Sequence, residues 1–257
     1  MSPAGTQVHR RFAGLPGGDY VASGFALDGI QRWVRRRRPR RVLELGPGIG
    51  ATTAALIESL DRSGARLEGG GGPRHVAVER SGYCLDHLAE NLGADRAKVT
   101  VVEWVSDAPP GPYDLVVVDG IGPADGDPEV TAERSAAETA AAVSDLGHRA
   151  VVIVENDRSH QRRAIEAAGR GPWVTAHIRP WDGTPGYHLY LYDPTPVERT
   201  LCGVRRVGDR LWHPHGIRSV RRLVKRILGR ELRVRSDVPS AGEPDDPSPS
   251  APWEGCG

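Results

Sequence analysis

Short runs rich in Val, Ile, Leu and Tyr recur along residues 20–194, and stretches with apolar residues at helical spacing separate most of them. The strand-like runs cover residues 41–45, 75–79, 99–103, 114–119, 149–155, 173–179 and 187–193. The helical patterns between the first six runs cover residues 51–60, 82–92, about 129–146 and 158–168. Strands that alternate with helices are joined by crossover connections, which predicts a mostly parallel sheet covered by helices on both faces.

The last two strand-like runs are connected differently. Only the segment PWDGTPG (180–186) lies between them, which is too short for a helical crossover. Two strands joined by such a short connection pair antiparallel. We therefore expect an α/β fold with a Rossmann-like, doubly wound, seven-stranded sheet that is mostly parallel and ends in an antiparallel hairpin.

The composition changes along the chain and predicts four regions. Residues 1–19 are polar and glycine-rich and are expected to form a flexible lead-in, followed by one domain over 20–194. Residues 195–235 are strongly basic, and within them 217–228 (IRSVRRLVKRIL) has the pattern of an amphipathic helix with an arginine face. Such a helix suits an anionic membrane surface or an acidic partner, or it packs on the domain with its arginines solvated. Residues 236–257 are rich in Pro, Ser and acids and are expected to be disordered.

Overall composition excludes several classes of protein. The formal net charge is +1, so we expect no nucleic-acid partner. The three cysteines, Cys84, Cys202 and Cys256, are scattered and odd in number, which argues against a disulfide framework or a zinc site. No apolar secretion signal or membrane-spanning run is evident, so a cytoplasmic location is expected.

The segment VLELGPGIGA (42–51) places Gly46, Gly48 and Gly50 directly after a predicted strand. A glycine bend at this point lets the backbone approach a ligand closely, and this one fits both dinucleotide sites and S-adenosylmethionine sites. Glu44, on the strand itself, favours the second ligand. Its carboxylate can hold the cationic amino acid end of S-adenosylmethionine, directly or through water, whereas it would repel a pyrophosphate.

Acidic residues also follow the next two predicted strands. Glu79 ends the second strand, where a carboxylate can accept hydrogen bonds from both ribose hydroxyls. Ser106 and Asp107 follow the third strand, where an acid can accept a hydrogen bond from the adenine amino group. Open α/β sheets bind ligands at the carboxyl ends of their strands, so these acids are expected to meet at one edge.

Three segments, VLELGPGIGATTAAL, HVAVERSGYCLDHLAENL and YDLVVVDG, resemble the successive core motifs of class I S-adenosylmethionine-dependent methyltransferases. The likeness covers about residues 20–194 and includes the terminal hairpin. It implies a seven-stranded sheet with the last strand inserted antiparallel. It also implies in-line transfer of a methyl group from the sulfonium to a small-molecule acceptor. Resemblance to the catechol O-methyltransferase-like branch of this family favours a hydroxyl oxygen as the atom that is methylated.

A narrower likeness is to the catechol O-methyltransferase-like branch, which holds Mg²⁺ at the ends of the fourth and fifth strands. The matching positions here are Asp119, Glu155 and Asn156, so Mg²⁺ is the second cofactor that this likeness implies. Two features depart from that branch: the branch carries a lysine shortly after the fourth-strand Asp whereas none lies near Asp119 here, and Glu155 stands where the branch has Asp. The alternative is that Asp119 lines the cofactor pocket and Asn156 caps the following helix.

The acceptor side of the predicted site offers Asp119 and His160 as catalytic candidates. His160 lies near the start of the helix after the fifth strand, and its imidazole has a pKa suited to proton abstraction. Two other functions remain open on the sequence. One is a nicotinamide-dependent oxidoreductase on a similar fold, and the other is a non-catalytic adaptor that acts through its basic helix.

Overall fold

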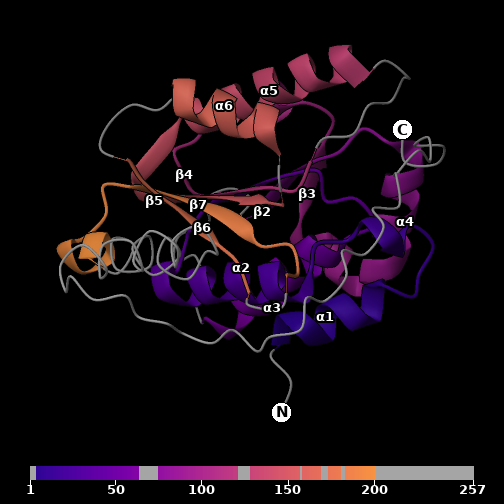
Figure 1. Ribbon diagram of the computed structural model, residues 1–257. Helices are drawn as coiled ribbons and strands as arrows, with labels where there is room; N and C mark the ends of the chain where they lie inside the picture. The colour runs from indigo at the N-terminus through magenta and orange to yellow at the C-terminus, as the bar shows by residue number, and fades with distance from the viewer. Residues whose placement is uncertain are drawn as a thin grey trace, which may run out of the picture.

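The computed structural model describes residues 4–63, 75–120, 128–156, 158–168, 173–180 and 183–200 (Figure 1). The α-helices are α1 (Ala4–Phe12), α2 (Gly24–Arg37), α3 (Ala51–Arg62), α4 (Gly82–Leu92), α5 (Pro128–Ser144) and α6 (Ser159–Ala168). The strands are β1 (Val42–Leu45), β2 (His75–Val78), β3 (Thr100–Val102), β4 (Tyr113–Val118), β5 (Leu146–Glu155), β6 (Trp173–Ile178) and β7 (Tyr187–Tyr192). Short 3₁₀ turns cover Gly18–Tyr20, Gly93–Lys98 and Val105–Asp107.

The seven strands form one sheet in the order β3-β2-β1-β4-β5-β7-β6. The first five strands in this order pair in parallel, while β7 lies antiparallel between β5 and β6. Each strand coincides with one of the predicted runs, and the short connection between β6 and β7 joins antiparallel neighbours as expected. The predicted fold class is confirmed.

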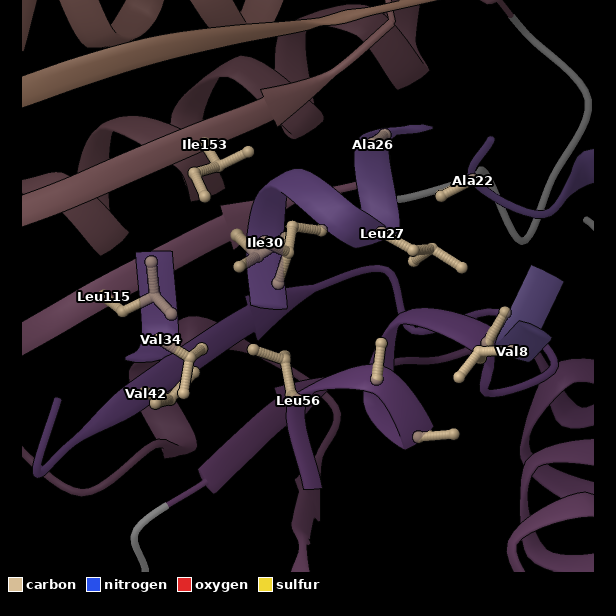
Figure 2. Packing of buried hydrophobic residues seen from close by; sticks show 14 of the residues in the cluster. Val8, Ala22, Ala26, Leu27, Ile30, Val34, Val42, Leu56, Leu115 and Ile153 are labelled. Atoms are coloured by element: carbon tan, nitrogen blue, oxygen red, sulfur yellow. The ribbon is translucent and has the colours of Figure 1, made fainter. Parts of the chain in front are cut away.

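Side chains of the sheet alternate between two apolar cores. Along β5, Val151 and Ile153 belong to the core under α1 to α4, whereas Val152 and Val154 belong to the core under α5 and α6. Figure 1 shows α5 and α6 on one side of the sheet and α1, α2 and α3 on the other. Figure 2 shows the packing of the first core from α2, α3 and the sheet, with Ile30, Val34, Leu56, Val42, Leu115 and Ile153. Burial on both faces explains why these strands are nearly continuous apolar runs.

Residues 4–12 differ from the flexible lead-in expected over 1–19, because they form helix α1. Val8 and Phe12 lie one helical turn apart and are both buried in the core beside α2 and α3. Asp28 of α2 holds the start of α1: its Oδ1 accepts a hydrogen bond from the Gly5 N–H at 2.7 Å, and its Oδ2 accepts one from the Thr6 hydroxyl at 3.0 Å. The segment is therefore ordered by contacts with distant residues.

Replacing Asp28 with Ala is expected to lower the free energy of unfolding by about 1–2 kcal/mol, the usual effect of removing a helix cap. Asp19 is exposed and is a suitable control, because changes at exposed sites without such contacts stay within about 0.5 kcal/mol. Urea denaturation of both variants measures the difference. Equal stabilities for Asp28→Ala and Asp19→Ala would show that the cap does not anchor α1.

The chain stays attached to the domain beyond the expected boundary near residue 195. Glu198 is buried, and its carboxylate pairs with Arg37 at 3.0 Å and Arg36 at 3.3 Å, at the end of α2. Burial alone would raise the pKa of Glu198, but hydrogen bonds from Thr195 and the charges of the two arginines lower it below its usual value.

The predicted amphipathic helix 217–228 and the expected disordered end 236–257 lie outside the described residues. None of the helices in the described ranges is long and apolar enough to cross a membrane.

Candidate functional site

The three glycines form a bend between β1 and α3. Gly46, Gly48 and Gly50 have φ angles of 76°, 54° and 103°, which side chains rarely tolerate. A Cβ on Gly46 would lie 1.6 Å from the carbonyl oxygen of Gly120, so the bend packs directly on the end of β4. A Cβ on Gly48 would meet no atom within 4 Å. The bend is therefore fixed at its first glycine and open at its second, as a cradle for a ligand requires.

Glu79, directly after β2, lies against this open part of the bend. Its Oε2 accepts a hydrogen bond from the Gly48 N–H at 3.2 Å, and its Oε1 accepts hydrogen bonds from the N–H groups of Arg80 and Ser81. Burial raises the pKa of Glu79, while these three N–H donors act in the opposite direction. The carboxylate predicted to bind a ribose thus lies beside the glycine bend.

Glu44, in contrast, is enclosed beneath α3 and has no exposed surface. Its Oε2 pairs with Nε2 of His75 at 2.8 Å and accepts a hydrogen bond from the Thr53 hydroxyl at 2.9 Å. Its Oε1 has no hydrogen-bond partner among the described residues. This second oxygen is buried, so an enclosed water molecule is the partner left to it.

Sequence reasoning missed both partners of Glu44, although the register of the sheet contained a signal for His75. Glu44 is opposite Ala77 in the parallel pair β1–β2, and His75 lies two positions earlier on the same face of β2. A carboxylate buried in a strand needs a hydrogen-bond donor, and the histidine at the start of the neighbouring strand supplies one.

Ser106 and Asp107 lie in the short turn Val105–Asp107 after β3 and are both exposed. Asp107 Oδ2 accepts a hydrogen bond from the Trp104 N–H at 3.3 Å. The Trp104 ring lies under the Arg80 guanidinium, whose carbon is 4.1 Å from the ring centre. This contact joins the ends of β2 and β3, so the two predicted acidic positions are neighbours at one edge of the sheet.

Asp119, directly after β4, lies on the other side of the bend from Glu79. Its side chain is 9% exposed, and its Oδ2 accepts a hydrogen bond from the Thr52 hydroxyl of α3 at 2.9 Å. The pKa of Asp119 lies well above its usual value, chiefly through burial and then through the charge of Glu155. Arg158 and Thr52 oppose this rise.

Glu155 and Asn156, the other two residues of the predicted metal set, have different surroundings. Glu155 is buried at the end of β5, and burial raises its pKa against the opposing charge of Arg158 and a backbone hydrogen bond from Ser23. Asn156 is exposed, adopts a φ of 55°, and donates its N–H to the carbonyl of Gly186. Since α6 begins at Ser159, Asn156 does not stand at the cap position of this helix.

An arginine that sequence reasoning did not single out lies beside the predicted metal set. Nη2 of Arg158 lies 3.6 Å from Oδ1 of Asp119 and also donates to the main-chain carbonyl of Asp119. A guanidinium in this position already supplies positive charge and repels a divalent ion. The predicted set of Asp119, Glu155 and Asn156 therefore does not fit Mg²⁺ in this arrangement. In the described part of the chain, no group of three or more His, Cys, Asp or Glu residues could hold a metal ion.

His160 lies in the first turn of α6 and is exposed. It follows Arg158 by two residues, so it is near the end of β5, where an acceptor is expected. Its role as a general base stays a prediction.

The sequence and the structure of the chain were compared with those of known proteins. No protein-family model matches the chain, and no curated protein matches its sequence. Among solved structures, it is similar to cofactor-bound Rv0187 from MTB, with a TM-score of 0.52 and 21% identity over 75% of this chain and 89% of that one. It is also similar to the O-methyltransferase TomG from Streptomyces achromogenes in complex with SAM, with a TM-score of 0.50 and 23% identity over 74% and 88%.

A third similar structure is the SAH-bound methyltransferase PaMTH1 from Podospora anserina, with a TM-score of 0.52 and 15% identity over 75% of this chain and 89% of that one. These likenesses extend over most of each solved chain, and the seven-stranded sheet with its inserted antiparallel strand agrees with them. The chain therefore has the fold of the class I S-adenosylmethionine-dependent methyltransferases.

Proposed function

We propose that this protein is an enzyme that transfers the methyl group of S-adenosylmethionine to a hydroxyl oxygen of a small molecule. The observation that carries the proposal is the hydrogen bond from the Gly48 N–H to the Glu79 carboxylate. A pyrophosphate needs the free N–H groups of such a bend, and an anionic side chain beside it repels phosphate. A nucleoside with ribose hydroxyls and a positively charged sulfur suits the same carboxylate.

The residues around the bend fit the parts of S-adenosylmethionine. Glu79 would hold the ribose, and Asp107 at the end of β3 would accept a hydrogen bond from the adenine. Oε1 of Glu44, which is buried and lacks a partner, would bind the amino acid end through water. When bound, this cofactor supplies an electrophilic methyl group. The similarity to TomG in complex with SAM and to SAH-bound PaMTH1 supports this choice of ligand.

The acceptor would approach from the ends of β4 and β5. Asp119 and Glu155 lie there, with His160 exposed at the start of α6. Transfer of a methyl group in line requires proximity and orientation more than covalent catalysis, so the main task of these residues is to hold the acceptor oxygen and take up its proton.

Calorimetric titration separates this function from its rivals. The full chain is expected to bind S-adenosylmethionine and its demethylated product, and to show no binding of NADH at the same concentrations. Binding of NADH alone would favour the oxidoreductase. Against the adaptor, a full-length variant whose basic residues in 217–228 are replaced by Gln is expected to bind S-adenosylmethionine as tightly as the unaltered chain. Absence of binding in both proteins contradicts the proposal.

A further inference from the structure

We propose that the guanidinium of Arg158 takes the place of a divalent cation in this site, so that the acceptor is bound and methylated without a metal ion. The inference rests on the proposed function for the reaction itself. The structural basis of the inference is separate from that function. Among the described residues around Asp119 and Glu155, Arg158 is the side chain that brings positive charge to both carboxyl groups.

Two successive close approaches connect Arg158 to the glycine bend through Gly120. Gly46 packs on the carbonyl of Gly120, so closely that a Cβ would lie 1.6 Å from its oxygen. Gly120, with a φ of 106°, in turn faces the guanidinium, because a Cβ there would lie 2.6 Å from Nη1 of Arg158. Gly120 therefore lies between the bend and the charged group of Arg158, at the end of β4.

The guanidinium of Arg158 is anchored by Asp119 and remains partly exposed. Nη2 is used by the carboxylate and the carbonyl of Asp119, and Nε is buried with no hydrogen-bond partner in the described residues, so the exposed part of the side chain lies elsewhere on the arginine. The side chain keeps 29% of its surface exposed, so a small molecule can reach it. A planar, permanently charged donor suits a hydroxyl oxygen that becomes negatively charged as it reacts.

The charge of Arg158 also matches the chemistry required. In the transfer, the acceptor oxygen forms a bond to the methyl carbon, and the carbon–sulfur bond breaks with its electron pair staying on sulfur. The hydroxyl proton passes to a proton acceptor at the ends of β4 and β5 and from there to solvent. A fixed positive charge near the oxygen favours loss of that proton, which is the task of the metal ion in a metal-dependent site.

A competition between Arg158 and a metal ion tests the proposal. Mn²⁺ is titrated into the full chain and followed by electron paramagnetic resonance, with and without the demethylated cofactor. The unaltered protein is expected to bind no Mn²⁺ below about 1 mM. Arg158→Ala is expected to bind it at least about tenfold more tightly, because Asp119 and Glu155 lose their cation. Addition of Asp119→Asn to this variant is expected to remove the new site.

Three controls make each outcome decisive. Arg158→Lys keeps the charge and is expected to behave like the unaltered chain. Arg162→Ala removes an arginine inside α6, four residues after Arg158, and is expected to create no Mn²⁺ site. Arg158→Met retains packing if the alanine variant does not fold. Binding of Mn²⁺ by the unaltered chain that depends on Asp119 overturns the proposal. Failure of both Arg158→Ala and Arg158→Met to gain a site overturns it as well.

Failure of this inference can be distinguished from failure of the proposed function. Calorimetry with S-adenosylmethionine reports on the glycine bend and Glu79, whereas the Mn²⁺ titration without cofactor reports only on Asp119, Glu155 and Arg158. A protein that binds S-adenosylmethionine and also Mn²⁺ through Asp119 is a metal-dependent methyltransferase, and only the role of Arg158 is then lost.

Discussion

Replacement of Glu79 with Ala is expected to raise the dissociation constant for S-adenosylmethionine at least about 100-fold. Two hydrogen bonds from the ribose hydroxyls to an ionised carboxylate are lost, each with a contribution of about 1.5–3 kcal/mol, and 1.4 kcal/mol corresponds to a factor of ten. The variant also loses the contact that holds the Gly48 N–H. Isothermal titration calorimetry with the folded variant measures the change.

Glu103 provides a matched control, since it is an exposed carboxylate directly after β3 at the same edge of the sheet. Glu103→Ala is expected to change the dissociation constant by less than about a factor of two, as for other exposed positions. Glu79→Gln keeps the shape of the side chain but removes its charge. Its dissociation constant for S-adenosylmethionine is expected to lie between those of Glu103→Ala and Glu79→Ala. If folded Glu79→Ala binds S-adenosylmethionine as the unaltered chain does, the ribose is held elsewhere and the proposed cofactor site is wrong.

The same carboxylate predicts how cofactor affinity depends on pH. Burial raises the pKa of Glu79 in the free protein above the usual value of a glutamate. Only the ionised form accepts hydrogen bonds with both oxygens, so affinity is highest above this pKa and falls as the pH is lowered through it. The decline is therefore expected to begin at a higher pH than an ordinary glutamate would give, and it should be absent in Glu79→Gln.

The strands and their layers could be predicted because burial on both faces leaves a simple pattern in the sequence. The apolar run 114–119 predicts a strand on its own composition, and β4 (Tyr113–Val118) occupies almost the same residues. The pairing of β6 with β7 followed from the length of one connection. The apolar pattern also located the ends of the second and fourth strands. Because parallel strands end at the same edge of a sheet, Glu79 and Asp119 could be predicted to lie at that edge.

What the sequence did not predict depends on contacts between distant residues. Glu44 and His75 are 31 positions apart, and only the register of β1 and β2 brings them within 2.8 Å. Helix α1 has few apolar residues, so its order depends on Asp28 and on the burial of Phe12. Arg158 had a weak signal, as a cation three residues after Glu155. Its position over Gly120 depends on a backbone conformation that only the fold defines.

Gly46→Ala is expected to have the largest effect on folding of any single change in the site, with a loss of more than about 4 kcal/mol in the free energy of unfolding. The new Cβ would lie 1.6 Å from the Gly120 carbonyl oxygen, which is main chain and cannot rotate away. The bend or the end of β4 would have to move, and Asp119 and Arg158 would move with it. Urea denaturation followed by circular dichroism measures this loss in the free energy of unfolding. The loss is largest if the variant does not fold at all.

Gly48→Ala separates this steric clash from the backbone conformation. Gly48 also has a positive φ, of 54°, but its Cβ position meets no atom within 4 Å. Only the cost of a left-handed residue applies there, about 1–2 kcal/mol. The two alanine variants should therefore differ by at least about 2 kcal/mol, with Gly48→Ala still folded. If Gly46→Ala is as stable as Gly48→Ala, then Gly46 does not pack against the end of β4, and Gly120 does not connect the bend to Arg158.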